Sequence, residues 1–368
     1  MATGFFWDER TFWHGGGNYA FTLPLGGLVQ PLAAGGLPES PETKRRMKNL
    51  MDVTRLTGVL ESQSAPAATQ EMLGRVHPER YLSKFKVVSD AGGGELGHHA
   101  PFAQGGYEIA ALSAGLVVAA VEAVATGELN NAYALSRPPG HHCTADDPQG
   151  FCLFANIAIA VEQSLAAGHL SRVAVVDWDV HHGNGTESIF YDRDDVLTIS
   201  LHQQGNYPLT TGALEDRGTS AGTGYNINLP LHAGTGHVAY LHAIDRVVIP
   251  ALERFQPDMI IVACGFDAAM PDPLARMQAT AETFGAMTQR LKDTAARLCG
   301  GKLVLAHEGG YSEVYVPFCG HAAIAALAGS DIAAPDPMAR GFALRQPAPA
   351  FDAFLKNAID EMALTLEL

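Results

Sequence analysis

The sequence predicts an α/β fold in which helices cover both faces of a parallel β-sheet. In the centre and the C-terminal half, short runs rich in β-branched residues alternate with longer amphipathic runs. The short runs VAVVD, MIIVACG and LVLAH are almost continuously apolar, which is typical of strands buried on both faces. Because helical segments stand between these runs, the strands connect by crossovers and lie parallel.

Each predicted strand is a short apolar segment that ends in polar or glycine-rich sequence: Ala132–Ser136, Arg172–Trp178, Val196–Leu201, Met259–Cys264 and Leu303–Ala306. The predicted helices are longer and amphipathic: Tyr107–Ala125, Leu153–Ala167, Ala239–Phe255, Thr280–Leu298 and Ala350–Leu364. Residues 1–100 are rich in Gly and Pro and have weaker periodicity. We expect them to form helices and loops that flank the sheet.

Length and composition limit the class of protein. At about 150 residues per domain, 368 residues suggest two or three domains, but no linker-like tract divides the chain, so we expect one domain over residues 1–368. The 47% hydrophobic and 17% charged residues exclude a disordered chain. A net charge of −15, spread along the sequence, argues against nucleic acid as a partner and permits a cationic substrate.

The sequence favours a soluble cytoplasmic protein without a membrane partner. The start, MATGFFWDERTFW, carries acidic residues early and lacks the basic and apolar regions of a signal peptide. Residues 109–125 form the most apolar stretch, but Ser113 and Glu122 interrupt it, which suits a buried helix better than a membrane span. The five cysteines are odd in number and form no CxxC pair, as expected in a reducing compartment.

Five unusual loops follow the predicted strands. Their sequences, in chain order, are RPPGHH, DVHHGNG, HQQGNYP, GFDAAMPDP and HEGGYS. In parallel α/β sheets the functional loops lie beyond the carboxyl ends of the strands. The five loops therefore predict an active site at one edge of the sheet.

A metal site is the chemistry that the DVHHGNG loop favours. In an extended segment, Asp177, Asp179 and His181 point the same way because alternate side chains share a face. Asp267 follows the next well-defined strand and can reach the same edge as a third ligand. Two carboxylates and one imidazole suit zinc and leave an open position, which is typical of a catalytic site. The alternative is that these groups only cap strand ends, although such a cluster is costly to bury without a charge partner.

The two histidines of RPPGHH are candidates for acid–base catalysis. His141 and His142 follow a rigid Pro-Pro-Gly turn and could flank a reacting water molecule as general base and then general acid. Each imidazole needs a partner on its other nitrogen, and Asp177 and Asn184 are suitable groups. The alternative is a histidine pair on the surface.

The HEGGYS loop offers an oxyanion donor, because two glycines allow Tyr311 to approach the site closely. Without the other loops, a tyrosine in this position would more often serve packing. Gly150, Phe151, Cys152 and Tyr207 could line a narrow apolar tunnel, and a core role explains them equally well.

Other signals are weaker. His98 and His99 follow a Gly-rich run, and we interpret them as part of a solvated loop. Cys143 and Cys152 lack zinc-finger spacing, so we do not expect them to be metal ligands. No strand is followed by GxGxxG or a P-loop, so we expect no nucleotide cofactor.

Taken together, the motifs RPPGHH, GFC, DWDVHHGNG, SLHQ, GFDA–DPLA and EGGY resemble, in order and spacing, the zinc-dependent histone deacetylase and acetylpolyamine amidohydrolase family. The similarity extends over about His77 to Gly329. The resemblance implies a single arginase-like domain with a parallel, mostly eight-stranded sheet.

The resemblance also implies roles for individual residues. Zinc would bind Asp179, His181 and Asp267. His142 would be the general base and acid and His141 its electrostatic partner, with Asp177 orienting His141, Asn184 orienting His142, and Tyr311 polarising the acyl carbonyl. A structural potassium ion would lie among Asp177, Asp179, His181, Ser200 and Leu201, and a second one near Phe190, Arg193, Val196 and Tyr225. Substrate would contact Gly150, Phe151 and Tyr207 in the tunnel and Leu274 at its rim.

Three positions place the chain within the family. Asn184 stands where the class I branch has Asp, so the chain resembles class II, and the pKa of His142 should be lower than in class I. Tyr311 stands where the weakly active vertebrate class IIa enzymes have His, which predicts a competent deacetylase. Leu274 stands where the polyamine-selective branch has Glu, which favours acyl-lysine over polyamines. Glu95 is our candidate for the acid that holds the substrate backbone at the rim.

The first function hypothesis is zinc-dependent deacylation of N-acyl-lysine in proteins or peptides. The second is the same chemistry on acetylpolyamines or another small N-acyl amine. The third, a silent acyl-lysine-binding module, would require a lost ligand or a lost Tyr311, and neither is lost. A two-metal ureohydrolase would need more bridging carboxylates. The oligomeric state stays open, with a homodimer or homotetramer allowed.

Overall fold

In the computed structural model, residues 2–20, 22–24 and 36–368 are described. Eight parallel strands form one sheet in the order β10-β9-β8-β11-β12-β7-β1-β4. The strands are β1 (Thr3–Phe6), β4 (Glu61–Gln63), β7 (Asn131–Ala134), β8 (Val173–Asp177), β9 (Val196–Gln203), β10 (Asn226–Leu231), β11 (Met259–Cys264) and β12 (Leu303–His307). The predicted fold class, an α/β protein with an eight-stranded parallel sheet, is confirmed. Two small antiparallel pairs lie apart from it: β2 (Tyr19–Ala20) with β3 (Leu23–Pro24), and β5 (Gly93–Glu95) with β6 (Pro101–Ala103).

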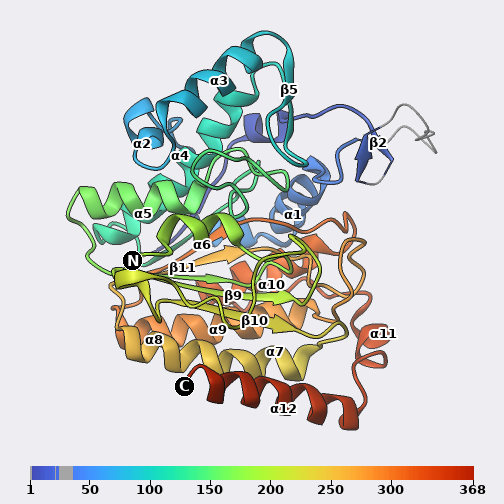
Figure 1. The fold of residues 1–368 in the computed structure, drawn as a ribbon. Helices are drawn as coiled ribbons and strands as arrows, with labels where there is room; N and C mark the ends of the chain where they lie inside the picture. Colours follow the sequence, from blue (N-terminus) through green and yellow to red (C-terminus); the bar gives the residue numbers. More distant parts are fainter. Residues whose placement is uncertain (1, 21, 25–35) are drawn as a thin grey trace.

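The sheet lies between two groups of helices (Figure 1). The helices are α1 (Pro41–Thr54), α2 (Gln70–Gly74), α3 (Glu79–Asp90), α4 (Gly106–Ala125), α5 (Asn156–Ala166), α6 (Asn184–Phe190), α7 (His237–Ala243), α8 (Ile249–Phe255), α9 (Ala281–Leu298), α10 (Val316–Ala328), α11 (Ala339–Ala343) and α12 (Pro349–Thr365). Four shorter helical segments are η1 (Glu9–Trp13), η2 (Leu56–Val59), η3 (Ser220–Gly222) and η4 (Ile244–Val248).

Alternate residues of each central strand point into two separate cores. In β8, Val173 and Val175 pack into the core that contains α3, α4 and α5, whereas Ala174 and Val176 pack into the core that contains α7 to α10 and α12. All five β8 residues are buried. The continuous apolar run VAVVD arises because a strand covered by helices on both faces has no exposed side.

Residues 1–100 were expected only to flank the sheet, and this prediction is wrong in part. β1 lies inside the sheet between β7 and β4, with Phe5 paired to Tyr133, and β4 forms one edge. These two strands have four and three residues. Segments this short show no measurable periodicity, and pairing with distant strands determines their conformation. The other edge strand, β10, was also missed, because its sequence NINLPL mixes polar and apolar residues.

The predicted helices are present with small changes at their ends. The segment predicted as one helix from Ala239 to Phe255 consists of α7, a π-helical turn (η4) and α8 in succession.

Helix α4 is long and apolar enough to cross a membrane, but 72% of its apolar window is buried inside the protein. It is therefore a core helix, and it packs against α5 and the strands β1, β7 and β12.

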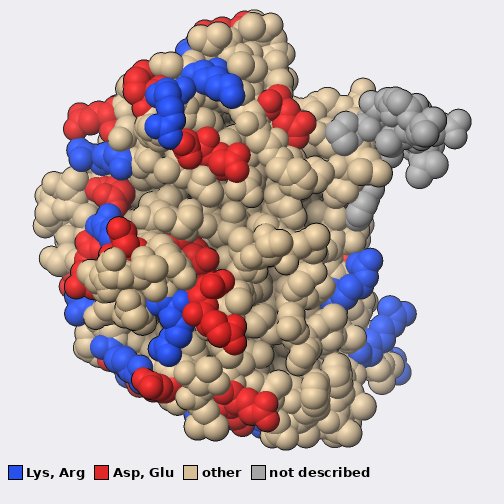
Figure 2. All heavy atoms as spheres, in the orientation of Figure 1, with Lys and Arg blue, Asp and Glu red and all other residues tan. Residues whose placement is uncertain are grey.

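The surface and the cysteines agree with the composition. On the face shown in Figure 2, acidic and basic side chains are interspersed around a largely uncharged central area. Most acidic side chains on this face lie in its left, upper and lower parts, beside basic ones, and the centre and right are nearly free of them. All five cysteines are unpaired thiols, and four of them are buried.

Strand register brings the predicted loops to one edge. Asp177 at the end of β8 pairs with Ser200 in β9 and with Ala263 in β11, and Cys264 pairs with His307 at the end of β12. The Ser136 hydroxyl, which follows β7, donates to the carbonyl of His307 at 2.8 Å. The loops that follow these strands therefore begin side by side.

Candidate active site

Three side chains from two loops form a buried cluster of metal-ligand type. Asp179 and His181 follow β8, and Asp267 follows β11. His181 Nδ1 lies 3.1 Å from Asp179 Oδ1 and 3.0 Å from Asp267 Oδ2. The three donor atoms lie within 4.8 Å of one another, and all three residues are buried. Two carboxylates and one imidazole fit a zinc site.

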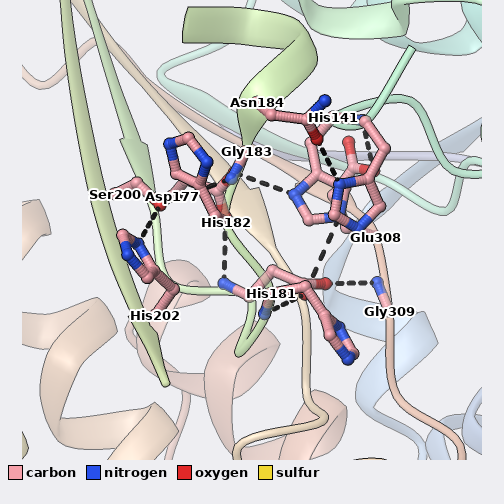
Figure 3. Close-up of polar contacts among 12 residues, drawn as sticks. His141, Asp177, His181, His182, Gly183, Asn184, Ser200, His202, Glu308 and Gly309 are labelled. Atoms are coloured by element: carbon pink, nitrogen blue, oxygen red, sulfur yellow. Dashed lines mark hydrogen bonds and ion pairs between the residues drawn. The ribbon is translucent and has the colours of Figure 1, made fainter. Parts of the chain in front are cut away.

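Backbone groups of neighbouring loops hold the two carboxylates in place. The Gly309 N–H donates to Asp179 Oδ2 at 2.8 Å, and the Val180 N–H donates to Asp267 Oδ1 at 2.8 Å. In each carboxylate, one oxygen therefore accepts a backbone N–H from a neighbouring loop and the other lies next to His181 Nδ1. Figure 3 shows His181 and Gly309, which contact Asp179. Gly265 packs directly against Asp179. A side chain at position 265 would not fit, because its Cβ would lie 2.1 Å from Asp179 Oδ2.

The electrostatics of the cluster also indicate a cation site. Burial disfavours ionisation of Asp179, but the nearby imidazoles of His141 and His181 outweigh it and hold the Asp179 pKa well below its usual range. Burial and the Asp179 charge raise the pKa of Asp267 to about 6. Burial lowers the pKa of His181, but the two carboxylates outweigh it and raise this pKa to about 10. A positive charge between the two buried carboxylates would therefore stabilise them, and a divalent cation can supply it.

The two histidines of the RPPGHH loop lie against this cluster, and each has a different partner. His141 Nδ1 lies 2.9 Å from Asp177 Oδ2, and His142 Nδ1 lies 2.7 Å from Asn184 Oδ1. The two rings lie 3.9 Å apart between centroids. Because a carbonyl oxygen accepts from His142 Nδ1, the proton of the neutral ring sits on Nδ1, and Nε2 is left as a base.

Their surroundings move the two pKa values in opposite directions. Burial opposes protonation of His141, but the charges of Asp179 and Asp177 outweigh it and raise its pKa well above the usual value. Burial, together with the neighbouring His141 and His181, lowers the pKa of His142 well below the usual value. The pair therefore combines a charged and a neutral imidazole, which is suited to acid–base chemistry.

A pocket of about 550 Å³ leads to these residues. It is lined by Thr22, His98, His99, His142, Gly150, Phe151, His181, Gln203, Asn206, Tyr207, Leu209, Pro273, Leu274, Arg276 and Tyr311. The rings of Phe151 and Tyr311 lie 5.9 Å apart, and those of Tyr207 and His142 lie 5.0 Å apart. Burial raises the pKa of Tyr311 well above its usual value, so its phenol keeps the proton that an oxyanion donor needs.

All four residues predicted to contact substrate thus line one pocket. Gly150 must be glycine there, because its φ is +50° and a Cβ would lie 2.4 Å from His142 Cδ2. His98 and His99 lie in a turn and are not buried, which agrees with our interpretation of a solvated loop, but their contact with the pocket was not predicted. His98 is exposed, but both line the pocket, and the His98 ring stacks on Tyr207 with centroids 6.0 Å apart.

The residues predicted to bind potassium fall into two groups. Ser200 and Leu201 lie in β9, where Ser200 pairs with Asp177 of β8, two residues before Asp179. The second set lies at the opposite end of β9, where the Arg193 N–H donates to the Phe190 carbonyl and the Thr198 N–H donates to the Tyr225 carbonyl. Val196 begins β9 between them.

Two buried carboxylates that sequence reasoning left without a role hold the loops of the site. Asp272 accepts the N–H of Tyr311 at 2.8 Å and the N–H of Leu274 at 2.9 Å, so it couples the phenol to the rim. Glu308 accepts backbone N–H groups of the RPPGHH turn. The sequence offered one indication of these two residues: Asp272 is the acid of the DPLA motif, and Glu308 is the acid of the EGGY motif.

A third missed feature is a buried ion cluster. Arg137, the first residue of RPPGHH, pairs with Glu39 at 2.9 Å, and Glu39 also pairs with Lys44. All three side chains are at most 1% exposed. Arg137 also donates to the carbonyls of Thr11 and His14. The cluster fixes the N-terminal loops to the site. Its one indication in the sequence was the arginine at the start of the RPPGHH motif.

Comparisons with known proteins agree with this site. Residues 38–327 match the family model described as the histone deacetylase domain. The chain is 56% identical to a histone deacetylase-like amidohydrolase of Pseudomonas aeruginosa, over 98% of this chain and 95% of the relative. It is 38% identical to a probable deacetylase of Archaeoglobus fulgidus, over 81% and 84%.

Among solved structures, the crystal structure of the HDA15 HD domain superposes with a TM-score of 0.81 at 31% identity, covering 100% of this chain and 99% of that chain. A family model that spans most of the chain, a relative above half identity and a shared fold all accompany the buried Asp-His-Asp cluster. The chain therefore belongs to the histone deacetylase family and is an amidohydrolase of that family.

Proposed function

We propose that this enzyme removes acetyl or other acyl groups from the ε-amine of N-acyl-lysine in proteins or peptides, in a zinc-dependent reaction. The observation that carries the choice of substrate is the rim of the pocket. Leu274 is apolar, and within the described residues no carboxylate lines the pocket. The remaining residues, 1, 21 and 25–35, contain no acid in their sequence. The pocket lining therefore offers no carboxylate to pair with the second ammonium group of a polyamine.

Asp179, His181 and Asp267 would hold the zinc ion. Their donor atoms lie close enough together to bind one ion. A cation there would also stabilise the two buried carboxylates, which supports this assignment. Bound there, zinc would polarise the acyl carbonyl and lower the pKa of water. The same proposal includes structural potassium, with Ser200 and Leu201 in one set and a second set at the far end of β9.

The chain's own residues would supply the proton transfers. His142 Nε2 would take a proton from the attacking water and later give it to the departing lysine amine. His141, held by Asp177, would stay protonated and stabilise the negative charge that develops. Tyr311 would donate its phenolic proton as a hydrogen bond to the carbonyl oxygen.

The test compares kcat/KM for an acetyl-lysine peptide with kcat/KM for acetylputrescine and acetylspermidine, with and without a hydroxamate chelator. We expect the peptide to be favoured by at least about tenfold, or about 1.4 kcal/mol in transition-state binding. A preference for polyamines, which the net charge of −15 would attract, would contradict the proposal.

A pair of variants sharpens the comparison. Leu274→Glu places a carboxylate at the rim and should raise kcat/KM for acetylspermidine relative to the peptide. Leu344→Glu, at a position 81% exposed and outside the pocket, adds the same charge elsewhere and should leave the ratio unchanged. Equal effects of the two variants would show that net charge, not the rim, selects the substrate.

A further inference from the structure

We propose that Glu308 is a positioning residue for this reaction. Its buried side chain ties the His141–His142 turn to the loop that carries Tyr311, and so sets the acid–base pair against the carbonyl donor. The inference rests on the proposed deacetylase function. It assigns a role to a fully buried acid that the reaction scheme above does not use.

The hydrogen bonds of Glu308 join two loops that are far apart in sequence. One oxygen, Oε2, accepts the Gly140 N–H at 2.6 Å and the His141 N–H at 3.1 Å (Figure 3). The two donors are the backbone N–H groups of the residue before the acid–base pair and of the first histidine of the pair. The carboxylate therefore fixes the path of the turn from which the two imidazoles project.

The backbone around Glu308 is itself fixed to the metal-ligand loops. The Glu308 N–H donates to the carbonyl of Cys264 at the end of β11. The next residue, Gly309, donates to Asp179 Oδ2, and its carbonyl accepts the Phe266 N–H. Tyr311 follows two residues later. Glu308 is thus the point at which the histidine turn, the metal cluster and the tyrosine loop are joined.

Hydrogen bonding, rather than charge, is the property that this position uses. Burial raises the pKa of Glu308 to about 7, so the side chain is only partly ionised at neutral pH. Both forms retain an oxygen that can accept the two N–H groups. The other oxygen, Oε1, is buried and has no hydrogen-bond partner among the described residues. Removal of the side chain would leave two buried N–H donors unsatisfied, which favours a shift of the turn.

A second metal site at this position is not favoured, although His141, Cys152 and Glu308 have ligand-type atoms within 4.8 Å of one another. Glu308 Oε2 already accepts two hydrogen bonds, and Cys152 Sγ accepts the His142 N–H at 3.4 Å. Burial also raises the pKa of the Cys152 thiol well above its usual value, which disfavours the thiolate that a metal requires.

The test uses the full zinc-loaded enzyme and the acetyl-lysine peptide. Glu308→Ala should lower kcat at least tenfold, while KM, zinc content and hydroxamate affinity stay within twofold. Glu308→Gln, which retains an acceptor oxygen, should restore kcat to within threefold of the wild type. If Glu308→Ala does not fold, Glu308→Leu fills the space without an acceptor and should show the same loss of kcat.

Asp258, which directly precedes β11, provides a control at the opposite end of the strands from the site. Its Oδ2 also accepts two successive backbone N–H groups, from Ser171 at 2.8 Å and Arg172 at 2.9 Å. Asp258→Ala should lower Tm without lowering kcat. If Glu308→Ala behaves like Asp258→Ala, with wild-type kcat per bound zinc, Glu308 is only structural and the inference is overturned. Equal loss in Glu308→Gln and Glu308→Ala would also overturn it.

The two proposals fail in different ways. A wild-type enzyme that hydrolyses no acyl-lysine peptide would refute the proposed function. A wild-type enzyme that is active, alongside Glu308 variants that keep wild-type kcat, would refute only the role of Glu308.

Discussion

Replacing Gly309 with alanine should weaken zinc binding at the site without unfolding the protein. Gly309 lies against both carboxylate ligands, and its N–H holds Asp179 Oδ2. An added Cβ would lie 2.2 Å from Asp267 Oδ2 and 2.6 Å from Asp179 Oδ2. Real side chains essentially never show such contacts, so both ligands must move.

The magnitude follows from the size of this displacement. To reach ordinary van der Waals contact, each carboxylate must move by about 1 Å. Metal sites tolerate deviations of only about 0.2 Å in ligand distance. Changing one group that supports a ligand typically lowers metal affinity by about 10- to 100-fold. Because two ligands are displaced here, we expect zinc to bind at least about 100-fold more weakly, or about 2.7 kcal/mol.

The assay is competitive zinc titration of the purified variant against a chelator of known affinity, with metal content after dialysis and kcat/KM measured in parallel. Gly74→Ala is the matched control, because Gly74 is exposed and an added Cβ there meets no atom within 4 Å. Zinc affinity within threefold of the wild type in Gly309→Ala would refute the reasoning. Asp179 and Asp267 would then not be the ligands.

Three further predictions test the proton chemistry and the stability. Tyr311→Phe should lower kcat by about 100-fold and leave zinc content normal, because one oxyanion donor is lost; normal turnover would remove this phenol from the mechanism. Asn184→Asp should raise the pKa of His142, so the acidic limb of the kcat/KM profile should move to higher pH; an unchanged limb would show that another group is the base. His77 Nε2 accepts the Ala155 N–H, and burial lowers the pKa of His77 from 6.5 to about 4, so the unfolded chain binds more protons between these pH values. Between pH 6.5 and about 4, the wild type should therefore lose about 3 kcal/mol more free energy of unfolding than His77→Gln. Urea titrations of both proteins at each pH measure this difference, and an equal pH dependence of the free energy of unfolding in the two proteins would refute the argument.

The metal and histidine residues could be identified from sequence because their arrangement depends on local rules. Asp177, Asp179 and His181 alternate in an extended segment after a buried strand, and such a segment directs alternate side chains to one side. Parallel strands place the loops at their carboxyl ends along one edge, so Asp267 could be assigned to the same place. The structure brings these residues together as those rules require.

Tertiary structure alone decided which distant residues support that site. Glu308 reaches the N–H of Gly140 across 168 positions of sequence, and Arg137 reaches the carbonyl of Glu39 across 98. Neither contact has a periodic or local signature. The same holds for β1, a four-residue strand whose place inside the sheet depends on pairing with β7 and β4. Side-chain alternation and strand direction are properties of a local segment, so they can be read from sequence. The contacts of Glu308, Arg137 and β1 form only when the folded sheet brings distant segments next to one another, so no local pattern encodes them.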